Sequence, residues 1–289
     1  MPTFRRTYLY KVFVKSYIKM KVSKSDHGKL RASHIPVSPP FRIISNVENA
    51  ISSLIRLINN DKPSLKGVIM KIKYLGHACF LLDNGKTKII VDPFLKGNPK
   101  AAADPEDIDA EYVFVTHDHD DHVGDAIEIC ERTGATAVTT VDVGVSRFDG
   151  VKFPVVTNNI GGWMPFPFGR VKTVIAIHGG GAPGSLACGF VFDIDGKKIY
   201  HAGDTALTSD MQFLADEKID LALLPIGDFF TMGPKDAVKA AKLIQPKTII
   251  PMHFNTFPPI KQDGDAFKKD AEAAGFACEV LKPGECYEL

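Results

Sequence analysis

The sequence predicts an α/β fold in which two β-sheets are covered by helices. Apolar and polar residues alternate around Asn84-Gly85 and around Asp195-Gly196. Both dipeptides favour the tight turns that join antiparallel strands, so each indicates a β-hairpin. Elsewhere, short β-branched runs alternate with segments of helical periodicity, which is typical of strand–helix units. Hairpins combined with such units indicate two sheets covered by helices.

A local pattern marks each element from Met70 onward. Residues 71–75 alternate polar and apolar side chains, and residues 112–116 are β-branched and aromatic, as in a buried strand. Gly134 ends one helix, and Pro234 begins another whose alanines recur at helical spacing. In order, the predicted elements are strands at 71–75, 80–82, 88–91 and 112–116, a helix at 125–132, strands at 135–140, 170–177, 189–194 and 197–200, a helix at 234–244, a strand at 248–250 and a helix at 266–274.

The first 69 residues differ in charge from the rest of the chain. They contain 13 Lys and Arg against 3 Asp and Glu, a formal charge of +10, whereas the remainder has 22 against 31, a formal charge of −9. Apart from an amphipathic stretch at about 45–58, which predicts a helix, their patterning is poor. We therefore expect a poorly ordered basic extension at 1–69 and a globular domain at 70–289.

This extension has three open interpretations. Its charge suits nucleic acid or an anionic membrane surface, and a basic segment poor in acids also resembles a transit peptide. We favour an upstream extension from a misassigned start codon, because a complete first strand begins at Met70. Under that interpretation nucleic acid is not a partner.

The composition is that of a soluble globular protein. Hydrophobic residues make up 45% and charged residues 24% of the 289, which allows a sizeable core. No apolar run approaches the roughly 18 residues that cross a bilayer, so we expect no membrane partner. The five cysteines form no CxxC pair, and their scatter is typical of buried thiols in the reducing cytoplasm.

The strongest chemical signal is the segment Thr116–His122, which reads THDHDDH. It places three imidazoles and three carboxylates directly after a buried strand, where they can converge on cations. Imidazole and carboxylate ligands suit Zn²⁺ and the neighbouring first-row metals. An accidental polar loop is the alternative, and the HxHxDH spacing after a strand argues against it.

This segment resembles the signature of the metallo-β-lactamase superfamily, and later elements follow in that family's order. These are His178 at the end of a strand, the turn Ala202-Gly203-Asp204-Thr205, and Pro251-Met252-His253. The opening segment Tyr74–Phe80 is similar to the branch that contains ascorbate-phosphate lactonase and other metal-dependent hydrolases. The resemblance covers residues 70–289 and implies a four-layer αββα sandwich.

The resemblance also implies a binuclear metal site. The first metal would be bound by His117, His119 and His178, the second by Asp121, His122 and His253, and Asp204 would bridge both. The implied cofactors are two divalent transition-metal ions, with zinc ahead of manganese, iron or nickel. The implied function is hydrolysis of a small ester, lactone or phosphodiester-type substrate by a metal-bridging hydroxide, with catalytic roles for Asp204, Asp121 and His77.

Chain length narrows the substrate class. Only 25 residues separate His178 from Asp204, and 36 follow His253. These lengths are too short for a nuclease-type insertion or for the helical substrate domain of glyoxalase II-like enzymes. We expect a small-molecule substrate and leave a homo-oligomer open. Two other function classes remain: a nucleic-acid processing protein that uses the basic extension, and a diiron oxidoreductase on the same fold, whose relatives would carry Glu in place of His119.

Several residues near the expected site have two interpretations. His77 follows the first strand and either acts on the substrate or is a buried, hydrogen-bonded histidine. Asp92 either holds a ligand histidine or starts a turn. We expect packing roles for His201, Trp163, Phe166 and Phe168, and a flexible loop, more than an anion-binding one, at the glycines 179–181.

Overall fold

The computed structural model describes residues 22–24, 30–32 and 69–289. The chain divides into two units, Met1–Gly67 and Val68–Leu289. In the first unit, the described residues are the short strands β1 (Val22–Lys24) and β2 (Leu30–Ala32), which pair antiparallel. The helix predicted at 45–58 lies outside the described residues, as does most of the basic extension.

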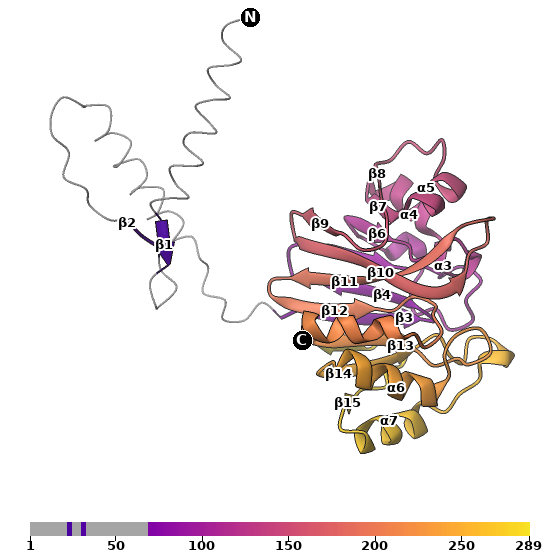
Figure 1. Cartoon of the computed structure of the whole chain (residues 1–289). Helices are drawn as coiled ribbons and strands as arrows, with labels where there is room; N and C mark the ends of the chain where they lie inside the picture. The colour runs from indigo at the N-terminus through magenta and orange to yellow at the C-terminus, as the bar shows by residue number, and fades with distance from the viewer. Residues whose placement is uncertain (1–21, 25–29, 33–68) are drawn as a thin grey trace, which may run out of the picture. The chain divides into compact units, whose positions relative to one another are not determined.

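Two seven-stranded sheets form the described part of the second unit (Figure 1). The first sheet has the order β16-β3-β4-β5-β6-β7-β8, and the second has the order β15-β14-β13-β12-β11-β10-β9. The strands of the first sheet are β3 (Lys71–Gly76), β4 (Cys79–Asp83), β5 (Lys88–Val91), β6 (Tyr112–Phe114), β7 (Thr136–Thr140), β8 (Val155–Asn158) and β16 (Cys286–Glu288). Those of the second are β9 (Trp163–Phe166), β10 (Gly169–Gly179), β11 (Leu186–Ile194), β12 (Lys197–His201), β13 (Leu221–Pro225), β14 (Thr248–Met252) and β15 (Ala277–Cys278).

Each sheet combines antiparallel hairpins with parallel strands. In the first sheet β3, β4 and β5 are antiparallel, and β5 to β8 are parallel. In the second sheet β10, β11 and β12 are antiparallel, and β12 to β15 are parallel. The carboxyl ends of neighbouring parallel strands lie side by side, so the loops that follow them meet at one edge of each sheet.

Helices cover the outer face of each sheet. On the first sheet these are α4 (Ala126–Thr133) and α5 (Val141–Arg147), and on the second they are α6 (Pro234–Ile244) and α7 (Gly264–Ala273). Shorter helical turns are η1 (Pro105–Asp107), α3 (Asp120–Val123), η2 (Ser209–Glu217) and η3 (Pro258–Ile260). In the part of the chain that the structure describes, none of the helices has the length and apolarity to cross a membrane.

The core follows the alternation of strand side chains. Phe114 of β6 points between the sheets, where its ring centroid lies 5.2 Å from that of Phe190 and 5.0 Å from that of Phe192. Val113 and Val115 point the other way and belong to the core beneath α4 and α5. The layers therefore run helix, sheet, sheet, helix, which confirms the predicted αββα sandwich.

The sequence patterns did not predict α5 and β9, and the position of each element in the fold explains why it forms. α5 contains Gly144, which weakens a helical pattern, yet a Cβ at this position would lie 2.5 Å from the Thr157 side chain of β8. The glycine therefore allows close packing of helix on strand. β9 contains Pro165, which cannot donate a ladder hydrogen bond, and β9 is an edge strand, where proline is tolerated.

A chain that begins at Met70 is expected to fold, with a thermal unfolding temperature within about 2 °C of the full-length value. Met70 is 1% exposed, and its backbone N–H and C=O pair with those of Leu289 at 3.2 and 2.9 Å, so the first sheet is complete at this residue. Thermal unfolding and limited proteolysis check this. A truncated chain that does not fold, or a full-length chain whose first 69 residues resist cleavage, contradicts the prediction.

Candidate metal centre

The seven expected ligands and His77 lie together, although they come from five separate segments of the chain. The HxHxDH segment follows β6, His77 occupies the turn between β3 and β4, His178 is near the end of β10, Asp204 follows β12, and His253 follows β14. Their ligating atoms form three groups, each within 4.8 Å: His77, Asp121, His122 and His253; His117, His119 and His178; and His117, His122 and Asp204. The last two groups share His117, and the first and last share His122.

Three imidazoles form the first candidate metal-binding group. The Nδ1 of His119 lies 2.9 Å from the Nε2 of His117 and 3.3 Å from the Nε2 of His178. Nitrogens bound to one tetrahedral zinc ion at about 2.0–2.1 Å are roughly 3.3 Å apart, so this spacing fits a shared ion. The hydroxyl of Thr116 donates to Asp92 at 2.7 Å and therefore accepts from the Nδ1–H of His117 at 3.0 Å. This leaves the lone pair on the Nε2 of His117 facing the group.

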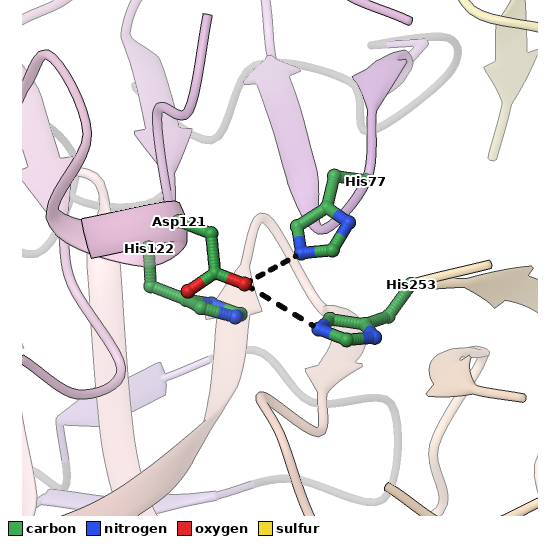
Figure 2. Close-up of side chains that lie close together, drawn as sticks. All are labelled: His77, Asp121, His122 and His253. Carbon is green, nitrogen blue, oxygen red and sulfur yellow. Dashed lines mark hydrogen bonds and ion pairs between the residues drawn. The ribbon is translucent and has the colours of Figure 1, made fainter. Parts of the chain in front are cut away.

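Asp121 is the centre of the second group, which Figure 2 shows. Its Oδ2 lies 3.2 Å from the Nε2 of His77 and 4.0 Å from the Nε2 of His253, with His122 beside it. A carboxylate only accepts hydrogen bonds, so His77 donates its Nε2–H, and its Nδ1 accepts from the hydroxyl of Thr256 at 2.9 Å. His77 is fully buried and therefore orients Asp121 from inside the protein.

Asp204 lies between the two groups. Its Oδ2 is 3.7 Å from the Nε2 of His178 and 3.0 Å from the Nε2 of His253, and its Oδ1 is 3.3 Å from the Nε2 of His122. The preceding Gly203 has φ +60°, and a Cβ there would lie 2.5 Å from the backbone oxygen of Cys188, so glycine is required. A buried carboxylate near both groups occupies the position expected for a bridging ligand.

Asp92 holds one of the expected ligands in place. It is fully buried, and its Oδ2 accepts from the Nδ1–H of His122 at 2.8 Å, while its Oδ1 accepts from the backbone N–H of Thr116 at 2.8 Å. Its backbone also begins a turn, because its carbonyl accepts from the N–H of Phe94 at 2.8 Å. Both interpretations of Asp92 therefore apply. When the His122 ring is neutral, its Nδ1–H donation to Asp92 leaves the Nε2 unprotonated and facing Asp204.

Three non-glycine residues at the site have left-handed backbone conformations. The φ angles are +59° for His77, +47° for Asp92 and +55° for His253. Such conformations cost about 1–3 kcal/mol each and persist only where surrounding contacts impose them. Here the N–H of His253 donates to the carbonyl of His77 at 2.8 Å, and the N–H of Asp92 donates to that of Phe114 at 2.9 Å. The fold therefore imposes these conformations at the site.

Several buried polar atoms at the site make no hydrogen bond, and the residues therefore fit a bound metal. In the described part of the chain, these atoms include the Nε2 of His122, the Nε2 of His253 and the Oδ1 of Asp204. Leaving such an atom unsatisfied costs about 1–3 kcal/mol, and coordination of a cation would satisfy all three. A donor set of imidazoles and carboxylates without thiolate suits divalent first-row metals.

Burial keeps several rings in the state that metal binding needs. It lowers the pKa of His117 well below the usual value and also lowers the pKa of His178, so both are neutral near pH 7. The pKa of His77 falls to about 4, first through burial and then through the neighbouring His253. Neutral imidazole is the form that binds metal.

The carboxylates at the centre stay ionised despite their burial. Burial by itself raises the pKa of Asp204, but His122 and His253 beside it hold the pKa well below its usual range. Conversely, burial lowers the pKa of His122, and Asp204 and Asp92 overcome this and raise it above the usual value. A cation that binds at His122 would therefore displace a proton.

Comparison with known proteins identifies the family. A beta-lactamase superfamily domain matches residues 71–253. The chain belongs to the beta-lactamase superfamily. UPF0173 metal-dependent hydrolases of Symbiobacterium thermophilum and Thermus thermophilus are 47% and 45% identical to it over 226 and 225 residues, and each alignment covers 76% of this chain and 100% of the relative. The structure of Igni18, a metallo hydrolase from the archaeon Ignicoccus hospitalis KIN4/I, is 35% identical with a TM-score of 0.72 and covers 76% of this chain and 98% of that one.

This protein is thus one of the metal-dependent hydrolases of the superfamily. Its likeness to Igni18 agrees with the αββα fold described above. A fold does not define a substrate, so the chemistry has to be argued from the site.

Sequence reasoning missed the role of Asp118 in this hydrolase. Its side chain is almost fully buried and accepts the backbone N–H groups of Gly181 at 2.6 Å and Ala182 at 2.8 Å. Its backbone oxygen accepts from the Nε of Arg147 at 2.9 Å. The glycine run after His178 therefore folds against an internal carboxylate, and its Gly181 N–H is engaged. The signal that could have predicted this role is the acidic residue at the first variable position of HxHxDH.

The residues expected to pack do so. His201 is fully buried, donates from Nε2 to the carbonyl of Ala78 at 2.8 Å and accepts from the N–H of Gly203 at 3.1 Å. Arg170 lies 4.2 Å above the ring of Trp163, and Phe166 and Phe168 stack at 5.0 Å. These four expected packing residues do not line the cavity at the candidate metal centre.

A cavity of about 440 Å³ opens at the candidate metal centre. It is lined by His119, Asp121, His178, Asp204 and His253, together with Phe230, Phe257 and Pro259. Its volume suits a small molecule. Five of the seven expected ligands therefore face a space that a small substrate can enter.

Replacing His77 with Ala is expected to lower turnover by about 10- to 100-fold, because Asp121 loses the buried donor that orients it. His77→Gln keeps an N–H donor and is expected to recover part of the rate. Metal content and rate should be measured on the same preparations. Loss of metal from His77→Ala would make His77 a ligand, and an unchanged rate would reduce it to a packing residue.

Proposed function

We propose that this hydrolase binds two divalent transition-metal ions and cleaves a small ester, lactone or phosphodiester-type substrate. One ion would be held by His117, His119 and His178, the other by Asp121, His122 and His253, with Asp204 bridging them. The position of Asp204 carries the proposal, because its two oxygens lie 3.0–3.7 Å from imidazole nitrogens of both groups. The predicted cytoplasmic location and small-molecule partner stay predictions.

The protein's own residues prepare the site for hydrolysis. Bound metal ions supply water activated near neutral pH and a Lewis acid for the carbonyl or phosphoryl oxygen. Asp92 and Thr116 fix the rings of His122 and His117 so that each presents Nε2. Asp121 accepts the His77 N–H on Oδ2 and retains a second oxygen for ligation or for proton transfer. Rigid orientation of this kind lowers the barrier because the ligands need no rearrangement during the reaction.

Elemental analysis of the purified, reconstituted protein is expected to find close to two ions of Zn, Mn, Fe or Ni per chain. Seven His and Asp side chains in overlapping groups motivate the count. The same preparation should hydrolyse γ-butyrolactone or bis(4-nitrophenyl) phosphate. Protein that binds none of the four metals contradicts the site, and saturation at one ion per chain contradicts the binuclear arrangement.

A further inference from the structure

Two loops beside the candidate metal centre carry aromatic side chains. They follow β13 and β14, which are neighbouring parallel strands with the register Leu221↔Thr248 to Pro225↔Met252. Their carboxyl ends are therefore adjacent. The first loop bears Phe229 and Phe230, and the second bears Phe257 and Pro259. We call Phe230, Phe257 and Pro259, which line the cavity together, the apolar wall.

The first loop is held firmly although its aromatic rings are exposed. Phe230 is 51% exposed, yet the turn around it closes through the N–H of Thr231, which donates to the carbonyl of Asp228 at 2.6 Å. The buried Met232 donates its N–H to the carbonyl of Thr205 at 2.9 Å. Thr205 directly follows Asp204, so the position of Phe230 is tied to the expected bridging ligand.

The second loop is tied to the site in a similar way. Thr256 hydrogen-bonds to His77 at 2.9 Å, and the ring of Phe257 meets that of His77 edge-on at a centroid distance of 5.5 Å. The ring centroid of Phe257 also lies 6.2 Å from that of Phe94. The backbone of both loops is therefore positioned before a substrate arrives, which reduces the reorganisation that binding to the wall requires.

The cavity thus has two kinds of surface. One consists of expected metal ligands, and the other is the apolar wall. Among the described residues, no Lys or Arg lines it. Burial of a hydrocarbon group against phenyl rings is favourable, whereas burial of an anion there is not. An exposed phenylalanine on a loop whose backbone is hydrogen-bonded to the site is a natural contact for the apolar part of a substrate.

We infer that the apolar wall binds a hydrocarbon group of the substrate, so that the enzyme prefers uncharged alkyl-substituted lactones or esters to phosphodiesters. This inference rests on the proposed hydrolytic function. In the reaction, the water oxygen bonds to the carbonyl carbon, the ring C–O bond breaks, and a water proton passes to the departing alkoxide. One lactone and one water give one hydroxy acid.

Metal-loaded protein should be assayed with γ-butyrolactone, γ-hexanolactone, γ-octanolactone and bis(4-nitrophenyl) phosphate. In the unmodified protein, kcat/KM is expected to rise roughly two- to fourfold for each added methylene and to be lowest for the phosphodiester. Phe230→Ala is expected to reduce the ratio of kcat/KM for γ-octanolactone over γ-butyrolactone by about tenfold. Phe230→Leu, which keeps an apolar side chain, should retain most of the ratio.

Phe213→Ala is the matched control. Phe213 is 66% exposed and lies in η2, outside this cavity, so its removal should leave the ratio unchanged. Equal kcat/KM across the lactones, preference for the phosphodiester, or equal loss on every substrate in Phe230→Ala overturns the inference. Metal-loaded protein that hydrolyses neither lactone nor phosphodiester overturns the proposed function instead. The unfolding temperature and metal content of each variant show whether it has folded. If a variant misfolds, the series of lactones with increasing alkyl length, assayed with the unmodified protein, still tests the inference.

Discussion

Replacing Asp204 with Ala is expected to abolish turnover and to leave the protein with fewer than two metal ions per chain. Two divalent cations about 3.5–4 Å apart repel each other strongly, and a carboxylate between them screens that repulsion. Asp204 is 2% exposed and lies near His122, His178 and His253, and a neutral water molecule in its place would not supply its negative charge. Rate and metal content should be measured on the same samples.

Asp204→Asn and Asp236→Ala are the controls for this variant. Asn keeps the size of the side chain without its charge, so Asp204→Asn should also lose metal if charge is what matters. Asp236 lies on α6 and forms a surface ion pair with Lys239, so its removal should change neither rate nor metal content. An Asp204→Ala protein with two metals and full activity would contradict the whole site.

Removal of the metal with a chelator is expected to abolish turnover and to lower the unfolding temperature by about 10 °C. A ligand that binds only the folded state at 1,000 times its dissociation constant stabilises it by about 4 kcal/mol, and each kcal/mol shifts a domain of this size by about 2–4 °C. Without cations, the Nε2 atoms of His122 and His253 and the Oδ1 of Asp204 remain buried without a hydrogen bond. Calorimetry before and after chelation, with an activity assay, measures both effects.

Addition of zinc or manganese to the stripped protein should restore both the unfolding temperature and the rate. Magnesium is the control ion, because it prefers oxygen ligands over the imidazoles that dominate this centre. Stripped protein that unfolds at its original temperature and keeps its rate would show that the buried cluster is stable and active without metal.

Most of the fold could be predicted because its signals are local. Asn84-Gly85 and Asp195-Gly196 marked the turns of the β4–β5 and β11–β12 hairpins, and Pro234 marked the start of α6. β9 and α5 escaped prediction because Pro165 and Gly144 oppose their own elements, and only an edge position and a close contact with Thr157 make them acceptable. Such contacts join residues far apart in sequence, and periodicity cannot detect them.

The candidate metal centre could likewise be predicted only in part. The HxHxDH segment could be selected from its residue types after a buried strand, and His178, Asp204 and His253 followed from the resemblance to the metallo-β-lactamase superfamily. The sequence left the role of His77 open, and the structure places its Nε2 3.2 Å from the Oδ2 of Asp121, so we propose that His77 positions this carboxylate. Asp118 and Thr256 had no assigned role, because their partners lie 63 and 179 residues away.

The sequence by itself determined that two sheets are covered by helices, where the HxHxDH segment lies and how the extension and the domain differ in charge, because each depends on local pattern or composition. The resemblance carried by the HxHxDH segment added the αββα order of the layers. Only the tertiary structure decided that Asp204 lies between two groups of imidazoles and that His253 and His77 share a backbone hydrogen bond of 2.8 Å. It also decided that Phe230 and Phe257 line one cavity. These relations depend on which loops the parallel strands bring to the same edge, and that is set by the pairing of strands distant in sequence.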